Sequence, residues 1–230
     1  MAPVSSGTEE PEEVGVPTGT WERLPDGRRA AVLAAAEAEF TARGFSGGSL
    51  NTICREAGVS KGSLFQYFTD KADLYVHLAE LASARVRTAT EAEIAALECD
   101  GDRLGALERV VEFWVRYFYD HPRERALTAA AALEPDPTAR AAVRAVTDRH
   151  YLAALRPLLE TGGAAGRLAP GADTEALLSL LLLLLPHLAL APHVAGLDPV
   201  LGMEGADADR AVAAARRLLA ALLGPYRAGG

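Results

Sequence analysis

The 230-residue chain contains only two cysteines, Cys54 and Cys99, and both lie in stretches with helical periodicity. No secretory segment precedes them, because the N-terminus is acidic and rich in Pro, Gly and Ser. These features argue against a secreted protein stabilised by disulfides. A reducing cytoplasm is the expected compartment.

Motifs for catalysis and metal binding are also missing. The chain has no nucleophile elbow, no glycine-rich phosphate loop and no HExxH or CxxC pattern. The five histidines are scattered, and the closest pair, His187 and His193, is six residues apart and so lies on different helix faces. We therefore expect no enzyme, no catalytic residue, no metal and no cofactor.

Lysine is rare, since Lys61 and Lys71 are the only two lysines among 23 basic residues. The net charge of -8 argues against a general nucleic-acid binder. Residues 21–71 are nearly neutral, with seven basic and six acidic residues, and both lysines fall within them. Because phosphate contact drives much of nucleic-acid affinity, any binding by this segment depends on where its charges lie.

The segment SLNTICREAGVSKGSLFQYFTDK, residues 49–71, predicts two short helices joined by a tight turn. Ser49 can cap the first helix, whose apolar face is Leu50, Ile53, Cys54 and Ala57. Gly58 ends this helix in a left-handed conformation, and Ser60 caps the second helix, expected over Lys61 to Phe68. Asp70 begins a third helix. This spacing is typical of a helix-turn-helix.

The stretch AGVSKGSLFQYFTDKADLY, with the preceding helix RRAAVLAAAEAEFTARGF, resembles the DNA-binding signature of TetR-type transcriptional regulators. The resemblance covers residues 25–78. It implies an all-α protein in which a three-helix DNA-binding domain, residues 21–70, precedes a larger effector-binding and dimerisation domain, residues 71–230. Residues 1–20 have too little apolar periodicity to fold and are expected to form a disordered acidic tail.

The resemblance implies contacts with double-stranded DNA at a palindromic operator. It places nine residues at the major groove or its phosphates: Asn51, Thr52, Lys61, Gly62, Ser63, Phe65, Gln66, Tyr67 and Lys71. Phe65 stands where the family often has tyrosine, which removes a hydroxyl that could bond phosphate. Core packing is the alternative role for Tyr67, and a solvated surface charge is the alternative for each lysine. Most of the family represses, but the sequence does not decide between repressor and activator.

The rest of the chain is helical and broken by Gly and Pro, with no competing strand pattern. Helices are expected at Asp70–Leu97, Asp102–Asp120, Pro122–Leu133, Pro137–Thr161, Thr174–Ala195 and Asp207–Leu223. The fifth of these is apolar around its circumference, which indicates either a membrane span or a helix buried on every side. Pro186 and Pro192 interrupt it, so cover by a second copy of the chain is favoured over a membrane.

The last helix also has a broad apolar face, formed by Val212, Ala215, Leu218, Leu219, Leu222 and Leu223. In TetR-type proteins the last two helices pair with their copies in a four-helix bundle. A homodimer through these helices is therefore expected, and a charge at Leu182 or Leu219 is expected to dissociate or unfold it.

The resemblance also implies an effector pocket among the middle helices. The candidate pocket residues are mostly aromatic: Phe113, Trp114, Tyr117, Phe118, His150, Tyr151 and His187. Core packing is the competing interpretation, because an aromatic cluster at helical spacing also fills a core. The Ala- and Leu-rich surroundings favour a small apolar or amphipathic effector. A helical protein-interaction module without DNA binding is the remaining alternative, and the helix-turn-helix motif argues against it.

Overall fold

The computed structural model describes residues 17–97, 102–160, 168–169 and 171–227. Within these ranges the chain forms ten α-helices, one short 3-10 helix and no strand beyond an isolated bridge between Leu168 and Arg227. The predicted all-α fold is confirmed. Cys99 lies outside the described residues, as do residues 1–16 of the expected tail.

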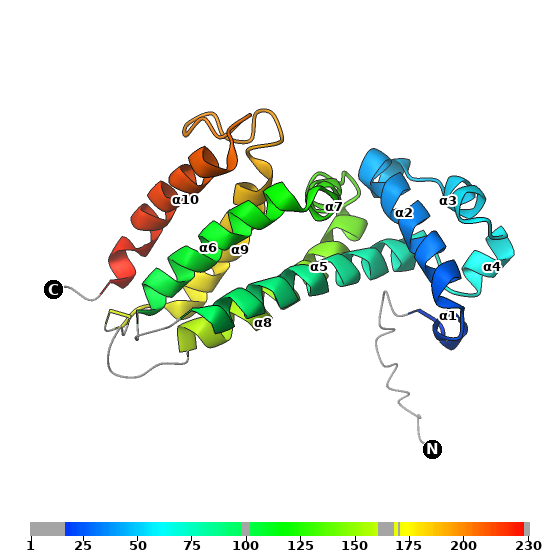
Figure 1. The fold of residues 1–230 in the computed structure, drawn as a ribbon, viewed down its shortest axis with the longest axis horizontal. Helices are drawn as coiled ribbons and strands as arrows, with labels where there is room; N and C mark the ends of the chain where they lie inside the picture. The colour runs from blue at the N-terminus through cyan, green and yellow to red at the C-terminus, as the bar shows by residue number, and fades with distance from the viewer. Residues whose placement is uncertain (1–16, 98–101, 161–167, 170, 228–230) are drawn as a thin grey trace, which may run out of the picture.

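The N-terminal domain consists of four helices and the first half of a fifth, at one end of the molecule (Figure 1). The helices are α1 (Gly19–Glu22), α2 (Asp26–Gly47), α3 (Leu50–Ala57), α4 (Lys61–Phe65) and the start of α5 (Lys71–Ala96). Apolar side chains at helical spacing meet in one small core, among them Phe40 of α2, Ile53 of α3, Leu64 of α4 and Leu74 of α5. The domain expected to end at residue 70 therefore shares its core with α5.

Thr18 and the first half of the short helix α1, Gly19 and Thr20, were expected to belong to a disordered tail. Instead, Thr18 donates its backbone N–H to the carbonyl of Tyr67, at 3.0 Å, and its hydroxyl to the carbonyl of Gln66. Trp21 is buried, with its ring centroid 5.7 Å from that of Tyr67 and 5.0 Å from that of Phe68. One large aromatic residue is enough to hold this segment against the domain.

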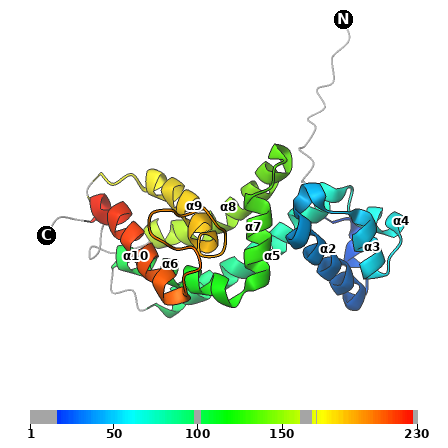
Figure 2. The same ribbon diagram turned by 90° about the horizontal axis from the view of Figure 1, so that it is seen from above.

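The C-terminal domain contains the rest of α5 and five further helices. These are α6 (Arg103–Asp120), α7 (Pro122–Ala132), α8 (Pro137–Glu160), α9 (Thr174–Leu190) and α10 (Ala208–Leu223). Helix α5 runs out of the N-terminal domain and along α8, while α6, α9 and α10 form the far end (Figures 1 and 2). The core between them is rich in leucine, including Leu107 of α6, Leu181 of α9 and Leu219 of α10.

Two helices end earlier than the sequence indicates. Helix α9 ends at Leu190 rather than Ala195, because Pro192 lacks an N–H and its ring clashes with the preceding turn. Helix α4 ends at Phe65 rather than Phe68, although Tyr67 and Phe68 still donate their N–H groups to the carbonyl of Leu64, both at 3.0 Å. The last turn is thus tightened rather than lost.

Helix α9 is not buried on every side within one chain. Leu181 is fully buried, whereas Leu180 and Leu183 are 42% and 67% exposed. In the part of the chain that is described, no helix combines the length and apolar character needed to cross a membrane.

Candidate nucleic-acid interface and ligand cavity

The turn between α3 and α4 is built by local caps, as the sequence predicts. Ser49 accepts a hydrogen bond from the backbone N–H of Thr52, and Gly58 ends α3 with a φ of 65°. Ser60 then accepts from the N–H of Ser63 at 3.0 Å, which starts α4. The left-handed Gly58 and the N-cap Ser60 reverse the chain within three residues. This short turn fixes the position of α4 against α3.

The nine predicted contact residues differ in exposure. Asn51, Lys61, Gly62, Phe65 and Gln66 are exposed, Thr52, Ser63 and Lys71 are half-buried, and Tyr67 is buried. All except Tyr67 and Lys71 lie on α3 or at α4 and its C-cap, the outermost helices of the N-terminal domain (Figure 1). The exposed set combines a cation, two amides and a glycine that allows close backbone approach.

Tyr67 and Lys71 have other partners inside the protein. Tyr67 is 6% exposed and packs on Trp21, so the core alternative applies to its ring. The ammonium of Lys71 donates to the carbonyls of Phe45 at 2.8 Å and Gly48 at 3.4 Å, and lies 4.3 Å from the centre of the Phe45 ring. Lys71 therefore caps the C-terminus of α2, where the helix dipole favours a cation, instead of standing free for a phosphate.

Sequence analysis missed Glu134, which lies in the turn between α7 and α8 and is 2% exposed. Its carboxylate accepts the backbone N–H groups of Phe45, at 2.7 Å, and Ser46, at 3.2 Å, and also the Ser46 hydroxyl. Gly44 takes a φ of 66° at this point and turns these donors toward the carboxylate. A glutamate between Leu133 and Pro135 resembles a solvated surface charge, and no local pattern indicates a partner 88 residues away.

The pKa of Glu134 lies below its usual value. Burial alone would raise it, but hydrogen bonds from Ser46, Asp136 and Phe45 to the ionised form outweigh this effect. Ionised Glu134 therefore stabilises the fold at any pH above the unfolded-state pKa of about 4.3, and this contribution is lost as the pH falls through the lower folded-state value.

We expect Glu134→Gln to lower the free energy of unfolding by about 1–3 kcal/mol at neutral pH, because it leaves buried donors without an acceptor. The difference from wild type should shrink as the pH falls below about 4.3, where the unfolded chain takes up a proton at Glu134 before the folded protein does. Urea denaturation of both proteins from about pH 7 to about pH 3.5 measures this. The exposed Glu56→Gln is the control. A difference that is as large at the acid end as at neutral pH would contradict the assignment.

The C-terminal domain contains a cavity of about 80 Å³ between α5, α7 and α8. Its walls are mostly small or apolar, with polar groups at Ser83, Thr128, Thr147, Glu124, Arg140 and Arg144. Of the seven predicted pocket residues, only Tyr151 lines it. The sequence prediction looked for large side chains, whereas this space exists because Ala82, Ala131 and Ala132 are small.

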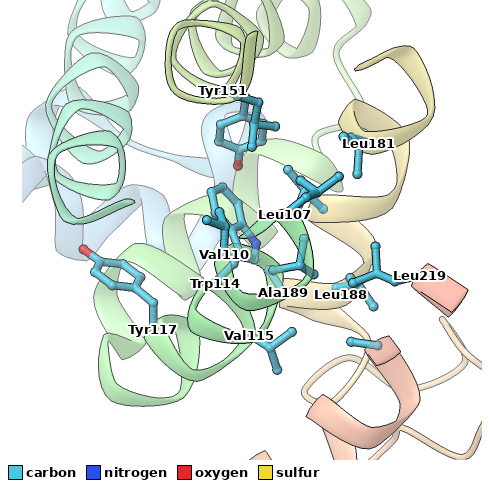
Figure 3. Packing of buried hydrophobic residues seen from close by; sticks show 14 of the residues in the cluster. Leu107, Val110, Trp114, Val115, Tyr117, Tyr151, Leu181, Leu188, Ala189 and Leu219 are labelled. Atoms are coloured by element: carbon cyan, nitrogen blue, oxygen red, sulfur yellow. The ribbon is translucent and has the colours of Figure 1, made fainter. Parts of the chain in front are cut away.

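The other predicted pocket residues pack elsewhere. Trp114, Tyr117 and Phe118 are buried in the core, and Trp114 lies edge-on to Tyr151 with ring centroids 4.7 Å apart (Figure 3). Phe113 packs on Tyr117 at the edge of the same core. His150 is buried and its Nε2 lies 2.8 Å from a carboxylate oxygen of Glu80. These side chains therefore pack inside the protein, as the competing interpretation expected, and do not line the cavity.

His187 lines a different space, an open apolar hollow on the outer side of α9 and α10. The hollow measures about 410 Å³ and is lined by Leu180, Leu183, Leu184, His187, Leu218 and Leu222. Leu182 is half-buried and packs against the core, so it does not line this hollow. Leu219 is fully buried in the core, so a charge there tests folding and not a subunit contact.

Residues 32–78, which contain most of α2, all of α3 and α4 and the start of α5, match the family of bacterial regulatory proteins described as the tetR family. These residues form a TetR-type DNA-binding domain. Regulators of this family bind DNA and are not enzymes. The part of the chain that is described contains no group of three or more His, Cys, Asp or Glu residues that could hold a metal ion.

Solved TetR-family structures share the fold over most of the chain. A TetR-family regulator from Streptomyces coelicolor is 25% identical, with a TM-score of 0.57 over 88% of this chain and 98% of that one. A TetR-family transcriptional regulator from Chloroflexus aurantiacus is 23% identical, with a TM-score of 0.58 over 91% and 96%. The regulator FadR from Bacillus subtilis, solved in complex with stearoyl-CoA, is 17% identical, with a TM-score of 0.65 over 86% and 99%.

Proposed function

We propose that the chain is a homodimeric repressor that binds a palindromic operator and is released from it by a small amphipathic effector. The observation that carries the proposal is the solvent-facing surface of α4 and its C-cap, with Lys61, Gly62 and Gln66 exposed on a capped, rigid helix pair. The proposal assigns residues 21–70 to DNA binding and residues 71–230 to effector binding and dimerisation. Repression is favoured over activation because most of the family represses.

The exposed residues suit different tasks at a DNA duplex. Lys61 offers a charge for a phosphate, and the start of α3 offers the polar side chains of Asn51 and Thr52 to the adjacent backbone. Gln66 can pair its amide with adenine in the major groove, and Phe65, 44% exposed, can contact a thymine methyl. Contacts to phosphate set the position of the helix, while contacts to base edges set the preference among sequences.

We expect Lys61→Ala to weaken binding to all DNA sequences alike and to lower the salt slope by about one, as for one lost phosphate contact. Gln66→Ala should instead reduce discrimination between matched and mismatched operators by about 1–3 kcal/mol. Gel shifts on an operator selected from random DNA, repeated at several salt concentrations, separate the two effects. Arg109→Ala, an exposed cation on α6, is the control for net charge. Equal loss by Gln66→Ala on both kinds of site would refute its role as a base reader.

The apolar hollow on α9 and α10 supports dimerisation. Within one chain it leaves leucine side chains in water, and an identical surface related by a two-fold axis would cover them. Two recognition helices related by the same axis require two inverted half-sites. A palindromic operator follows from this arrangement.

The cavity between α5, α7 and α8 is the proposed effector site. At about 80 Å³ it is smaller than ordinary ligand sites, which measure about 300–1,000 Å³. An effector of ordinary size would therefore have to displace the cavity wall, and would favour a conformation in which this wall is open. Ala82, Ser83 and Val86 of this wall belong to α5, which begins in the N-terminal domain, so such a displacement would move the DNA-facing helices.

An amphipathic effector fits the lining, because apolar walls lie beside Arg140 and Arg144. The stearoyl-CoA bound by FadR has the same general character, an apolar chain with an anionic head.

A further inference from the structure

The C-terminal domain holds the end of α2 through one buried carboxylate. Both oxygens of Glu134 are used as acceptors: one receives the N–H groups of Phe45 and Ser46, and the other receives the Ser46 hydroxyl and the N–H of Asp136, the latter at 3.1 Å. A Cβ at Gly44 would lie 3.1 Å from the first oxygen, so the backbone passes close to the carboxylate. This contact joins the turn after α7 to the last turn of α2.

The segment held in this way leads directly into the proposed DNA-binding surface. Residues 44–49 connect α2 to α3, and α3 begins with Asn51 and Thr52 in its first turn. Two other side chains hold the same segment: Lys71 donates to the carbonyls of Phe45 and Gly48, and Glu39 accepts the N–H of Ser49 at 2.9 Å. Lys71 and Glu39 come from α5 and α2, within the N-terminal domain. Glu134 connects the segment to the C-terminal domain.

We propose that Glu134 is a positioning residue for operator recognition, which fixes the angle of the DNA-binding helices on the C-terminal domain and thereby the half-site spacing that the dimer accepts. This inference rests on the proposed function, because spacing has meaning only for a dimer on a palindrome. Hydrogen bonds to an ionised, buried acceptor are short and directional, so they hold the backbone more closely than apolar packing alone does.

The same turn lies beside the proposed effector site. Arg140, which lines the cavity, donates from its guanidinium to the backbone carbonyl of Glu134. A change in the cavity wall at Arg140 is therefore passed to the residue that holds the end of α2.

Glutamine cannot replace the carboxylate here. Its side chain offers one acceptor oxygen and one NH₂ donor, so one side of the contact would set donor against donor. Glu134→Gln keeps the shape of the side chain and weakens the contact, because it removes the charge and one of the two acceptor oxygens. Ser46→Ala removes only the hydroxyl and leaves both backbone N–H groups in place. Glu80→Gln is the matched control, since Glu80 of α5 accepts hydrogen bonds from Arg149 and His150 of α8, away from residues 44–49.

The test uses an operator selected by the wild-type dimer from random DNA, together with versions that have one or two base pairs added or removed between the half-sites. Each added base pair turns one half-site by roughly 35° and shifts it by about 3.4 Å. For wild type and Glu80→Gln we expect a loss of about tenfold or more per base pair, because the DNA must be deformed to fit a fixed dimer. For Glu134→Gln the loss should fall below about threefold, with Ser46→Ala in between.

Hydrogen exchange on the free protein gives a second measurement. The Phe45 and Ser46 amides should exchange at least about tenfold faster in Glu134→Gln than in wild type, because a neutral amide replaces the ionised acceptor. If Glu134→Gln fails to fold, Ser46→Ala carries the spacing measurement.

If wild type binds tightly at only one half-site spacing and folded Glu134→Gln is equally selective, the inference is overturned and the proposed function stands. Wild-type protein that is indifferent to spacing would overturn the palindromic mode of binding, and the positioning role with it.

Discussion

Leu183→Glu is expected to yield a monomer that no longer binds its operator. Leu183 is 67% exposed in the single chain and lines the apolar hollow of α9 and α10, so the substitution leaves the core of one protomer untouched. In the proposed dimer this position is covered by the second copy. An ionised carboxylate buried there costs several kcal/mol, and the resulting monomer presents only one recognition helix.

Sedimentation equilibrium at micromolar concentration measures the dissociation directly, and a gel shift measures the loss of operator binding. Val200→Glu is the matched control, because Val200 is 84% exposed and lies outside the hollow. It should remain dimeric. A Leu183→Glu protein that dimerises as tightly as wild type would show that the subunits meet elsewhere. Leu219→Glu gives no such information, because Leu219 is fully buried and a charge at this position in the core would unfold the protomer.

Trp114→Ala should destabilise the protein by about 3–5 kcal/mol, the range for removing a large aromatic side chain from a core. Trp114 is 4% exposed, and its ring lies against that of Tyr151 (Figure 3) and also against that of Phe118. Urea denaturation of both proteins at one fixed concentration gives the difference, since the stability of a dimer depends on concentration. Trp21, the other tryptophan, remains as the fluorescent probe in the variant.

Phe65→Ala provides the comparison, since it removes an aromatic ring that is 44% exposed. Its effect on stability should stay within about 0.5 kcal/mol, as for an ordinary surface substitution. If Trp114→Ala were equally mild, the indole would border an open space, as the sequence-based pocket prediction required.

The sequence was sufficient for the parts of the fold that are determined locally. The caps at Ser49, Ser60 and Asp70 and the left-handed Gly58 each depend on residues within one turn, and the structure places all four as predicted. Helical periodicity likewise identified the buried faces of α3 and α4. The resemblance of residues 25–78 supplied the orientation of these helices toward DNA, which local patterns alone do not contain.

Contacts between distant segments were beyond the reach of the sequence. Glu134 meets Phe45 across 89 residues, and Trp21 meets Tyr67, so neither partner could be identified from its neighbours in the chain. Most of the predicted pocket residues lie away from the cavity between α5, α7 and α8 for a related reason. A cavity is set by the volumes that facing helices fail to fill, and this depends on how the helices pack.

The two lysines differ in how readily an acylating reagent can reach them. Lys61 is exposed, whereas the ammonium of Lys71 is held by two backbone carbonyls and the Phe45 ring. Acylation requires an amine that the reagent can reach, and the half-buried Lys71 side chain is enclosed by these carbonyls and by the ring. Of the two lysines, Lys61 is therefore the more readily acylated, and it lies on the helix that is proposed to face DNA. Lysine acetylation would remove the positive charge there, while the C-terminal domain, which has no lysine, would be unaffected.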